Sequence, residues 1–319
     1  MTITMISQSA QNSSFTVVLI ETGLAFVVIA LPCWRPRFLA GCKRIERAFT
    51  ALARRVWLQP GSQRSGVPYL TSQIRESLLP GEKLALVIPT LCEAENIGAL
   101  IDNVRSVIHP LGIPYEIVVV DDDSQDGTGD IVAAISRQDA HVRLLVRKGQ
   151  RGLSGAVLRG WQSTDATILG VMDADLQHPP ELLPKLIGAV VGGRDLAVGS
   201  RYTKGGELGN WNPMRKLLSA AAVWVTWPIQ QRSIRVKDPM SGFFMVRRRC
   251  LAGIPFQCSG FKLLLEVLVR ARLSSVEEIP IRFGRRCYGA SKANFRVGRD
   301  YGQLLARLYA GKIGFGHIS

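Results

Sequence analysis

The chain has 319 residues, enough for one large domain or two ordinary ones, and 40 lysines and arginines against 25 acidic residues give it a formal net charge of +15. Its six cysteines form no C-x-x-C pair and its four histidines no H-x-x-x-H pair, which argues against a zinc knuckle and a disulfide framework. The excess of positive charge indicates an anionic partner: nucleic acid, a lipid headgroup surface or a phosphorylated substrate.

Residues 1–80 are predicted to form an N-terminal extension that begins with a candidate membrane segment. Residues 15–32 are mostly apolar, carry Glu21 as their single charge, and are about long enough for a helix to span a bilayer. Lysines and arginines follow at once, so a span here would leave the rest of the chain in the cytoplasm. The alternative is a buried or interfacial helix.

Residues 37–58 are predicted to form a basic amphipathic helix. Apolar side chains recur at spacings of three and four from Phe38 to Val56, and the basic side chains lie elsewhere on the helix. Such a helix could lie on an anionic bilayer surface, or it could pack on the main domain with its charges in solvent. Residues 59–80 contain prolines and glycines and are interpreted as a linker, which places the main domain at 81–319.

From Lys83 onward, short apolar runs alternate with helical patterns. Strands are expected over 84–89, 116–122, 142–148, 168–173 and 196–202, and a helix follows each of the first four. This alternation predicts an α/β domain with a doubly wound, mostly parallel sheet. The almost wholly apolar strands agree with it, because parallel sheets are buried on both faces. Further elements are expected at 214–229, 241–246, 261–272, 276–283 and 299–309.

The strand at 168–173 runs directly into a pair of carboxylates, Asp173 and Asp175. Ligands of open α/β sheets bind at the carboxyl ends of the strands, and two carboxylates this close repel each other unless a cation lies between them. Hard oxygen ligands suit Mg²⁺ or Mn²⁺, completed by phosphates of a substrate. A D-x-D occurs about once by chance in a chain of this size, so a solvated turn is the alternative. The strand before it and Pro179-Pro180 after it favour the metal site.

Polar side chains also follow other strands at the same edge of the predicted sheet. They are Thr90, which follows Pro89, with Glu93 and Glu95; Asp121, Asp122 and Asp123; and Ser200, Arg201 and Tyr202. Each could simply cap the next helix, but their gathering at one edge indicates a substrate site. Glycines at 149, 152 and 155 do not have the G-x-G-x-x-G spacing after the first strand, which disfavours a dinucleotide-binding domain.

Seven blocks of sequence carry a resemblance to a known family. They are VIPTLCEAENI (87–97), VVVDDDSQDGT (118–128), RGLSGAVLRGW (151–161), VMDADLQHPPE (171–181), VGSRY (198–202), DPMSGFF (238–244) and FGRRCYGASK (283–292). Together they resemble the polyprenol-phosphate (dolichol-phosphate) mannosyltransferases, which are inverting family-2 glycosyltransferases with the GT-A nucleotide-sugar-binding fold. The resemblance covers about residues 83–305 and leaves the N-terminal extension outside.

The resemblance implies a metal-dependent, inverting transfer of mannose from GDP-mannose to a polyprenyl (dolichyl or undecaprenyl) phosphate, giving polyprenyl-phosphate β-mannose. It implies nucleotide-sugar binding by Pro89, Glu93, Asp121, Asp122, Asp173, Ala174 and Arg201. It implies Mg²⁺ or Mn²⁺ ligation by Asp173, Asp175 and Gln177. It implies acceptor-phosphate binding by Arg215, Arg286, Ser291 and Lys292. The residues expected to carry catalysis are Asp175, Arg201 and Arg286.

The chain also departs from the family pattern. Leu91 stands where the family usually has an aromatic residue, and Cys92 replaces an amide, which leaves the nucleotide base open. The same chemistry with another donor, such as UDP-glucose, is therefore an alternative, as is a binding protein without turnover. The expected partners are the nucleotide sugar, the lipid phosphate and a membrane surface, without nucleic acid. The expected location is the membrane, with the catalytic domain facing the cytoplasm.

Overall fold

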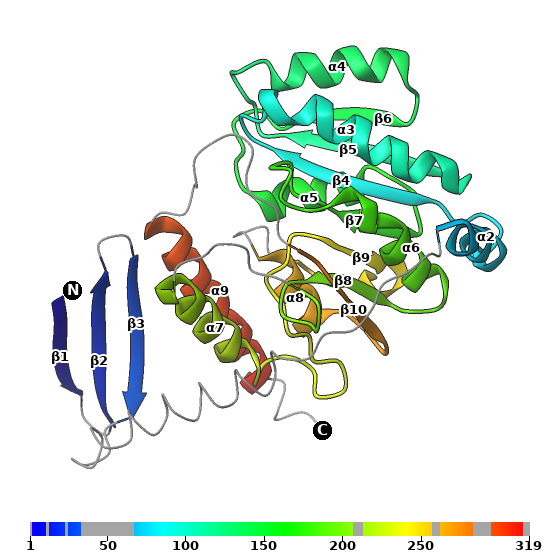
Figure 1. Cartoon of the computed structure of the whole chain (residues 1–319). Helices are drawn as coiled ribbons and strands as arrows, with labels where there is room; N and C mark the ends of the chain where they lie inside the picture. The colour runs from blue at the N-terminus through cyan, green and yellow to red at the C-terminus, as the bar shows by residue number, and fades with distance from the viewer. Residues whose placement is uncertain are drawn as a thin grey trace. The chain divides into compact units, whose positions relative to one another are not determined.

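The computed structural model describes residues 2–10, 13–22, 25–32, 67–206, 213–256, 262–282 and 295–314 (Figure 1). The chain divides into two units, one of residues 1–61 with 291–303 and the other of residues 62–290 with 304–319. The second unit contains the predicted α/β sheet.

The larger unit is built on a seven-stranded sheet with the order β10-β8-β9-β7-β4-β5-β6. Its strands are β4 (Leu84–Thr90), β5 (Tyr115–Asp121), β6 (Val142–Val146), β7 (Ile168–Val171), β8 (Leu196–Ser200), β9 (Phe244–Arg247) and β10 (Val276–Pro280). Strand β9 is antiparallel to β7 and β8, and the other neighbouring pairs are parallel. The predicted doubly wound, mostly parallel sheet is confirmed.

Helices cover both faces of this sheet, as Figure 1 shows. They are α3 (Ala94–Ile108), α4 (Thr128–Gln138), α5 (Leu153–Gln162), α6 (Leu183–Val191) and α8 (Leu263–Arg270). The chain also forms the helices α7 (Pro213–Thr226) and α9 (Phe295–Gly314). Strand β4 is buried along its whole length, and its side chains alternate between two apolar clusters. Leu86 joins a cluster with residues of α3 and α6, whereas Val87 joins one with residues of α5 and α8. Burial on both faces explains why the strand is apolar throughout.

Part of the segment predicted as a linker belongs to the domain. Residues 67–77 form helix α2 (Val67–Ser77), with Pro68 in its first turn, where proline is tolerated. Ile74 is buried in the core, and the Arg75 guanidinium donates hydrogen bonds to the carbonyls of Leu111 (2.6 Å) and Pro110 (3.0 Å). These contacts tie α2 to the short 3₁₀ helix η1 (His109–Leu111). The linker interpretation is therefore wrong for residues 67–77.

The smaller unit contains a three-stranded antiparallel sheet of β1 (Thr2–Ala10), β2 (Ser13–Thr22) and β3 (Ala25–Pro32). Residues 15–32, the candidate membrane helix, thus lie mainly in two paired strands, with Val18 opposite Ile29. The many β-branched residues of this stretch favour strands over a helix. Within the described residues, no helix is both long and apolar enough to cross a membrane. The predicted amphipathic helix at 37–58 lies outside the described residues.

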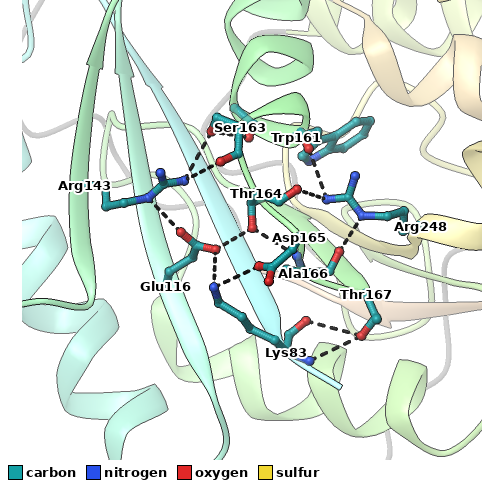
Figure 2. A network of polar contacts seen from close by, with 11 residues as sticks. Lys83, Glu116, Arg143, Trp161, Ser163, Thr164, Asp165, Ala166, Thr167 and Arg248 are labelled. Atoms are coloured by element: carbon teal, nitrogen blue, oxygen red, sulfur yellow. Dashed lines mark hydrogen bonds and ion pairs between the residues drawn. The ribbon is translucent and has the colours of Figure 1, made fainter. Parts of the chain in front are cut away.

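A polar network joins the amino ends of the strands, at the edge opposite the predicted site (Figure 2). Glu116 of β5 forms ion pairs with Lys83 Nζ at 2.9 Å and Arg143 Nε at 2.8 Å, and accepts a hydrogen bond from Thr164. Burial raises the pKa of the Glu116 carboxyl, but Thr164 and the two cations outweigh it, so the pKa lies below its usual value. The network fixes the starts of β4, β5 and β6 relative to one another.

Candidate active site

The parallel strands bring the predicted site residues to one edge of the sheet. Thr90, the last residue of β4, is in register with Asp121, the last residue of β5. The loop after β7 carries Asp173 and Asp175, and the loop after β8 begins at Arg201. The sheet topology therefore gathers residues that are far apart in the sequence, as ligand sites of α/β sheets require.

Asp121 is buried and holds its own loop in place. Its Oδ1 accepts hydrogen bonds from Thr90 Oγ1 (2.8 Å) and Ser124 Oγ (2.7 Å), and its Oδ2 accepts one from the Ser124 backbone N–H (2.8 Å). Both carboxylate oxygens are thus used within the protein. The contacts connect the end of β4 to the loop after β5.

Asp122 is also buried, and it pairs with a cation that the sequence does not single out. Arg147 donates to Asp122 Oδ1 from Nε at 2.7 Å, and the backbone N–H of Gly152 donates to Oδ2 at 2.7 Å. Arg147 also bonds the Gly152 carbonyl at 3.0 Å. Gly152 precedes α5 with a φ of 127°, a conformation that glycine adopts most readily. Asp122 and Arg147 therefore shape the glycine-rich turn before α5.

The loop after β5 caps helix α3 as well as its own helix α4. Three successive backbone N–H groups before and at the start of α3 donate hydrogen bonds to side chains of this loop. The N–H of Cys92 donates to Ser124 Oγ at 2.8 Å. The N–H of Glu93 donates to Thr128 Oγ1 at 2.9 Å, and that of Ala94 donates to Asp126 Oδ2 at 3.0 Å. Asp126 Oδ1 accepts the Thr128 N–H at 3.1 Å. These bonds satisfy N–H groups that a helix start leaves without partners, and they place Glu93 at this edge of the sheet.

The predicted metal ligands lie in a tight turn after β7. Asp173 Oδ2 lies 3.3 Å from His178 Nε2, whereas Asp173 Oδ1 is buried and accepts no hydrogen bond within the described chain. Asp175 Oδ1 accepts the N–H of Gln177 at 3.2 Å, and Leu176 between them has a φ of 58°, which is uncommon for a residue with a Cβ. A buried carboxylate oxygen without a donor fits ligation of a cation.

Ala174, expected to contact the nucleotide sugar, is buried in the apolar cluster that includes Leu183. Its side chain therefore anchors the turn between the two aspartates. Among the described residues, no group of three or more His, Cys, Asp or Glu side chains is arranged to hold a metal ion. A metal at this turn would depend on further oxygen ligands beyond the two aspartates.

Arg201 is held by a carboxylate that the sequence does not single out as its partner. Arg201 Nε and Nη2 donate to the two oxygens of Asp238 at 2.7 Å each, and the Arg201 backbone N–H donates to the same carboxylate at 3.0 Å. Asp238 is fully buried and the Arg201 side chain is 12 % exposed. Burial lowers the pKa of Arg201, but Asp238 outweighs it and keeps the guanidinium charged.

Lys262 is a second cation of the site that the sequence does not reveal as a functional residue. It precedes α8 and takes part in none of the hydrogen bonds and ion pairs found among the described residues. Burial and the charge of Arg201 lower the pKa of its ammonium group, and Asp173 and Asp238 raise it, which places Lys262 within electrostatic range of all three. The only sequence signal is a lysine at the start of an apolar helix.

The acceptor-phosphate residues are not tested by the structure. Arg286, Ser291 and Lys292 lie outside the described residues, and Arg215 lies in the first turn of α7, of which only the backbone is described. The other end of α7 exposes aromatic rings: Trp224 is 67 % exposed and Trp227 is 38 % exposed. The guanidinium of Arg235 lies 5.2 Å from the centre of the Trp227 ring.

Comparison with known proteins assigns this chain to a family. The family model for Glycosyl transferase family 2 matches residues 85–271. The chain is 41 % identical over 226 residues to the dolichol-phosphate mannosyltransferase of Pyrococcus furiosus, covering 71 % of this chain and 63 % of that protein. It is 35 % identical over 244 residues to the dolichol-phosphate mannosyltransferase of Saccharomyces cerevisiae, covering 73 % of this chain and 90 % of that protein.

The chain therefore belongs to glycosyl transferase family 2. The resemblance to the polyprenol-phosphate mannosyltransferases that the seven sequence blocks carry is confirmed. A third relative, the polyprenol monophosphomannose synthase of Mycolicibacterium smegmatis, is 33 % identical over 242 residues, covering 73 % of this chain and 88 % of that protein.

Solved structures confirm the GT-A type of fold. Mannosyl-3-phosphoglycerate synthase from Rubrobacter xylanophilus superposes with a TM-score of 0.56 at 21 % identity, covering 75 % of this chain and 76 % of that one. Glucosyl-3-phosphoglycerate synthase from Mycobacterium tuberculosis superposes with a TM-score of 0.56 at 19 % identity, covering 80 % of this chain and 85 % of that one. The latter structure contains Mn²⁺, UDP-glucose and phosphoglyceric acid.

Proposed function

We propose that this protein transfers mannose from GDP-mannose to a polyprenyl phosphate, with inversion at the sugar and with a divalent metal. The observation that carries the proposal is the turn after β7, where the buried Oδ1 of Asp173 has no hydrogen-bond donor among the described residues and Asp175 follows two residues later. Relatives 33–41 % identical to this chain are named dolichol-phosphate mannosyltransferase or polyprenol monophosphomannose synthase, which supports the mannosyl transfer and the polyprenyl phosphate acceptor. The chain spans 63 % of the length of the Pyrococcus furiosus relative.

Asp173, Asp175 and Gln177 would hold the metal ion, Mg²⁺ or Mn²⁺, through oxygen atoms. Such an ion neutralises charge on the leaving diphosphate as a Lewis acid. The structurally similar glucosyl-3-phosphoglycerate synthase contains Mn²⁺ together with a nucleotide sugar, which supports a divalent ion in a fold of this type. Two protein carboxylates would be enough if the donor diphosphate supplied further oxygen ligands.

The chain's own cations would supply the rest of the charge compensation. Arg201 shares its charge with Asp238 through two hydrogen bonds, so its net contribution to a bound anion is small. Lys262 has no such partner among the described residues, and it lies within electrostatic range of Asp173. We assign Lys262 to the donor diphosphate, which it would bind as a point charge. Arg201, held in place by Asp238, would line the site beside it.

The acceptor needs no strong general base. A phosphate monoester has a second pKa of about 6 and is therefore largely dianionic around neutral pH. Its oxygen attacks the anomeric carbon, a new carbon–oxygen bond forms, and the bond from that carbon to the diphosphate breaks. In-line attack inverts the configuration, so an α-linked donor gives a β-linked lipid sugar. Arg215, Arg286, Ser291 and Lys292 would position the acceptor phosphate by charge and hydrogen bonds.

We also propose that the protein works at a membrane surface, because its acceptor is a lipid. Two tryptophans exposed at the end of α7 and the net charge of +15 fit the headgroup region of an anionic bilayer. The N-terminal extension would add to this association. We place the catalytic domain on the cytoplasmic side of the membrane, because there the positively charged protein would face anionic lipids.

Transfer of label from GDP-mannose to organic-extractable lipid tests the proposal. Membranes that contain the protein would receive polyprenyl phosphate, Mn²⁺ and either radiolabelled GDP-mannose or radiolabelled UDP-glucose. Labelled lipid from GDP-mannose alone is the expected result. Label from UDP-glucose alone would retain the mechanism and replace the donor, and no label from either would contradict the proposal.

A further inference from the structure

Asp173, the first carboxylate of the D-x-D turn, is enclosed by residues to which neither the sequence nor the proposed reaction assigns a role. The Nε2 atom of His178 lies 3.3 Å from Asp173 Oδ2. On another side the carboxylate packs against Gly242: a Cβ atom built there would lie 2.6 Å from Asp173 Cγ and 2.7 Å from Oδ1. Real Cβ atoms essentially never come this close to other heavy atoms, so no side chain fits at position 242 while Asp173 keeps this position.

His178 is itself firmly placed. It is 3 % exposed, and its ring lies 5.3 Å from the ring of Phe243 at an interplanar angle of 33°. Phe243 is fully buried in the core beside β9. An ionised carboxylate only accepts hydrogen bonds, so a hydrogen bond to Asp173 forms in the tautomer that carries its proton on Nε2. The imidazole is thus a donor held in one orientation by packing.

From this geometry we propose that His178 is a positioning residue for the metal site. It fixes the Asp173 carboxylate through Oδ2, so that Oδ1, which has no donor in the part of the chain that the structure describes, is left for the cation. Gly242 leaves the space that this carboxylate position requires, and Phe243 holds the imidazole ring. The inference rests on the proposed function, in which Asp173 ligates the metal of a metal–diphosphate complex.

The physical reason is preorganisation. A carboxylate with one oxygen bonded to a fixed donor loses little side-chain freedom when the metal binds. Partners of metal ligands typically contribute 10- to 100-fold to metal affinity. A purely structural His178 would instead affect the free energy of unfolding without a specific effect on the metal. Metal affinity therefore separates the two roles.

Two substitutions at position 178 separate the hydrogen bond from the packing. His178→Phe keeps a flat ring next to Phe243 but has no donor, whereas His178→Gln places an amide N–H where Nε2 was. Mn²⁺ binding to the full chain in the presence of GDP, measured by electron paramagnetic resonance, is the readout. We expect His178→Phe to weaken Mn²⁺ binding about 10- to 100-fold, and His178→Gln to stay within about threefold of the unsubstituted protein. GDP binding without metal and thermal unfolding show whether each variant is folded.

Gly242→Ala tests the same carboxylate from its other side. Its Cβ displaces the Asp173 carboxylate, so Mn²⁺ binding with GDP should fall at least as far as in His178→Phe. Gly129→Ala is the matched control, because a Cβ at Gly129 in α4 meets nothing within 4 Å. This control should bind Mn²⁺ like the unsubstituted protein.

The outcomes distinguish this inference from the proposed function. If the unsubstituted protein binds Mn²⁺ with GDP and the His178→Phe variant binds it equally well, the positioning role is wrong and the proposed function stands. Equal losses in His178→Phe and His178→Gln would also contradict it, because the hydrogen bond would then not be the cause. If the unsubstituted protein binds no Mn²⁺ with GDP, the proposed metal-dependent reaction fails, and the inference fails with it.

Discussion

Arg201 and Asp238 form a two-pronged ion pair, with both nitrogen–oxygen distances at 2.7 Å, between the end of β8 and the DPMSGFF block. The pair is almost fully shielded from water, since Asp238 is 0 % and Arg201 12 % exposed. Such a pair is costly to break from one side, because the remaining charge stays buried.

Asp238→Asn should therefore destabilise the protein and reduce activity together. We expect a loss of about 3 kcal/mol in the free energy of unfolding, because the Arg201 charge loses its partner. Urea unfolding of the variant beside Asp130→Asn, a substitution at an exposed position of α4, gives the measurement and its control. An unchanged unfolding midpoint for Asp238→Asn would show that Arg201 finds another partner.

Lys262 should act on nucleotide affinity rather than on stability. Removing its charge in Lys262→Met is expected to weaken binding of GDP about tenfold, which corresponds to ~1.4 kcal/mol. Lys262→Arg should recover part of this affinity because it restores the charge with a different shape. Calorimetric titration with GDP measures both variants. Unchanged GDP affinity in Lys262→Met would show that Lys262 does not contribute to nucleotide binding.

Much of this architecture can be predicted from the sequence. The apolar runs at β4, β5 and β7 identify buried parallel strands, and the rule that ligands bind at strand carboxyl ends then locates Asp173 and Arg201. The helix α2 could not be predicted in the same way. Among the α2 residues whose side chains are described, only Ile74 is buried. Gly66 before the helix and Pro68 in its first turn are typical of a linker.

The partners of the site residues could not be predicted either, because they depend on distant contacts. Asp122 meets Arg147 and Arg201 meets Asp238 only once the sheet has formed. His178 lies five positions after Asp173 and next to a proline, so its spacing resembles no metal motif. The Phe243 ring that holds it comes from a distant part of the chain, directly before β9. The structure of residues 15–32 could not be predicted for a different reason. An apolar run of that length is compatible with a membrane-spanning helix or with two strands, and the run itself does not decide between them.

The two D-x-D carboxylates should be required for transfer. Asp175→Ala is expected to abolish labelling of lipid from GDP-mannose, because the metal loses one of its two protein carboxylates. A chelator should inactivate the unsubstituted protein, and added Mn²⁺ or Mg²⁺ should restore it. Full activity of Asp175→Ala with Mn²⁺ present would contradict the metal assignment.

Arg286 should act on the acceptor. In Arg286→Ala we expect the KM for polyprenyl phosphate to rise about tenfold or more, because an arginine–phosphate contact is charge-assisted and two-pronged. GDP affinity should change little. Initial rates at varied acceptor concentration, with calorimetry for GDP, measure the two effects. Equal losses in acceptor use and GDP binding would place Arg286 at the donor instead.

Glu116, at the edge of the sheet opposite the site, should make the free energy of unfolding depend on pH. Its pKa in the folded protein lies below the unfolded value of about 4.3, since Thr164, Lys83 and Arg143 outweigh the effect of burial. The ionised form is thus favoured by folding. Its contribution is fully present above pH ~4.3 and is lost as the pH falls through the folded pKa.

Glu116→Gln should therefore lower the free energy of unfolding at pH 7 by about 1–2 kcal/mol, a value reduced because Lys83 and Arg143 are each more than a third exposed. The difference between the variant and the unsubstituted protein should shrink as the pH falls below ~4.3. Urea unfolding at a series of pH values measures it. Asp165→Asn, at the exposed end of the same network, is the control and should show a much smaller difference, because solvent screens the ion pair of Asp165 with Lys83. The difference in the free energy of unfolding could instead stay constant down to the lowest pH at which both proteins fold. Glu116 would then stabilise the protein through packing and not through its charge.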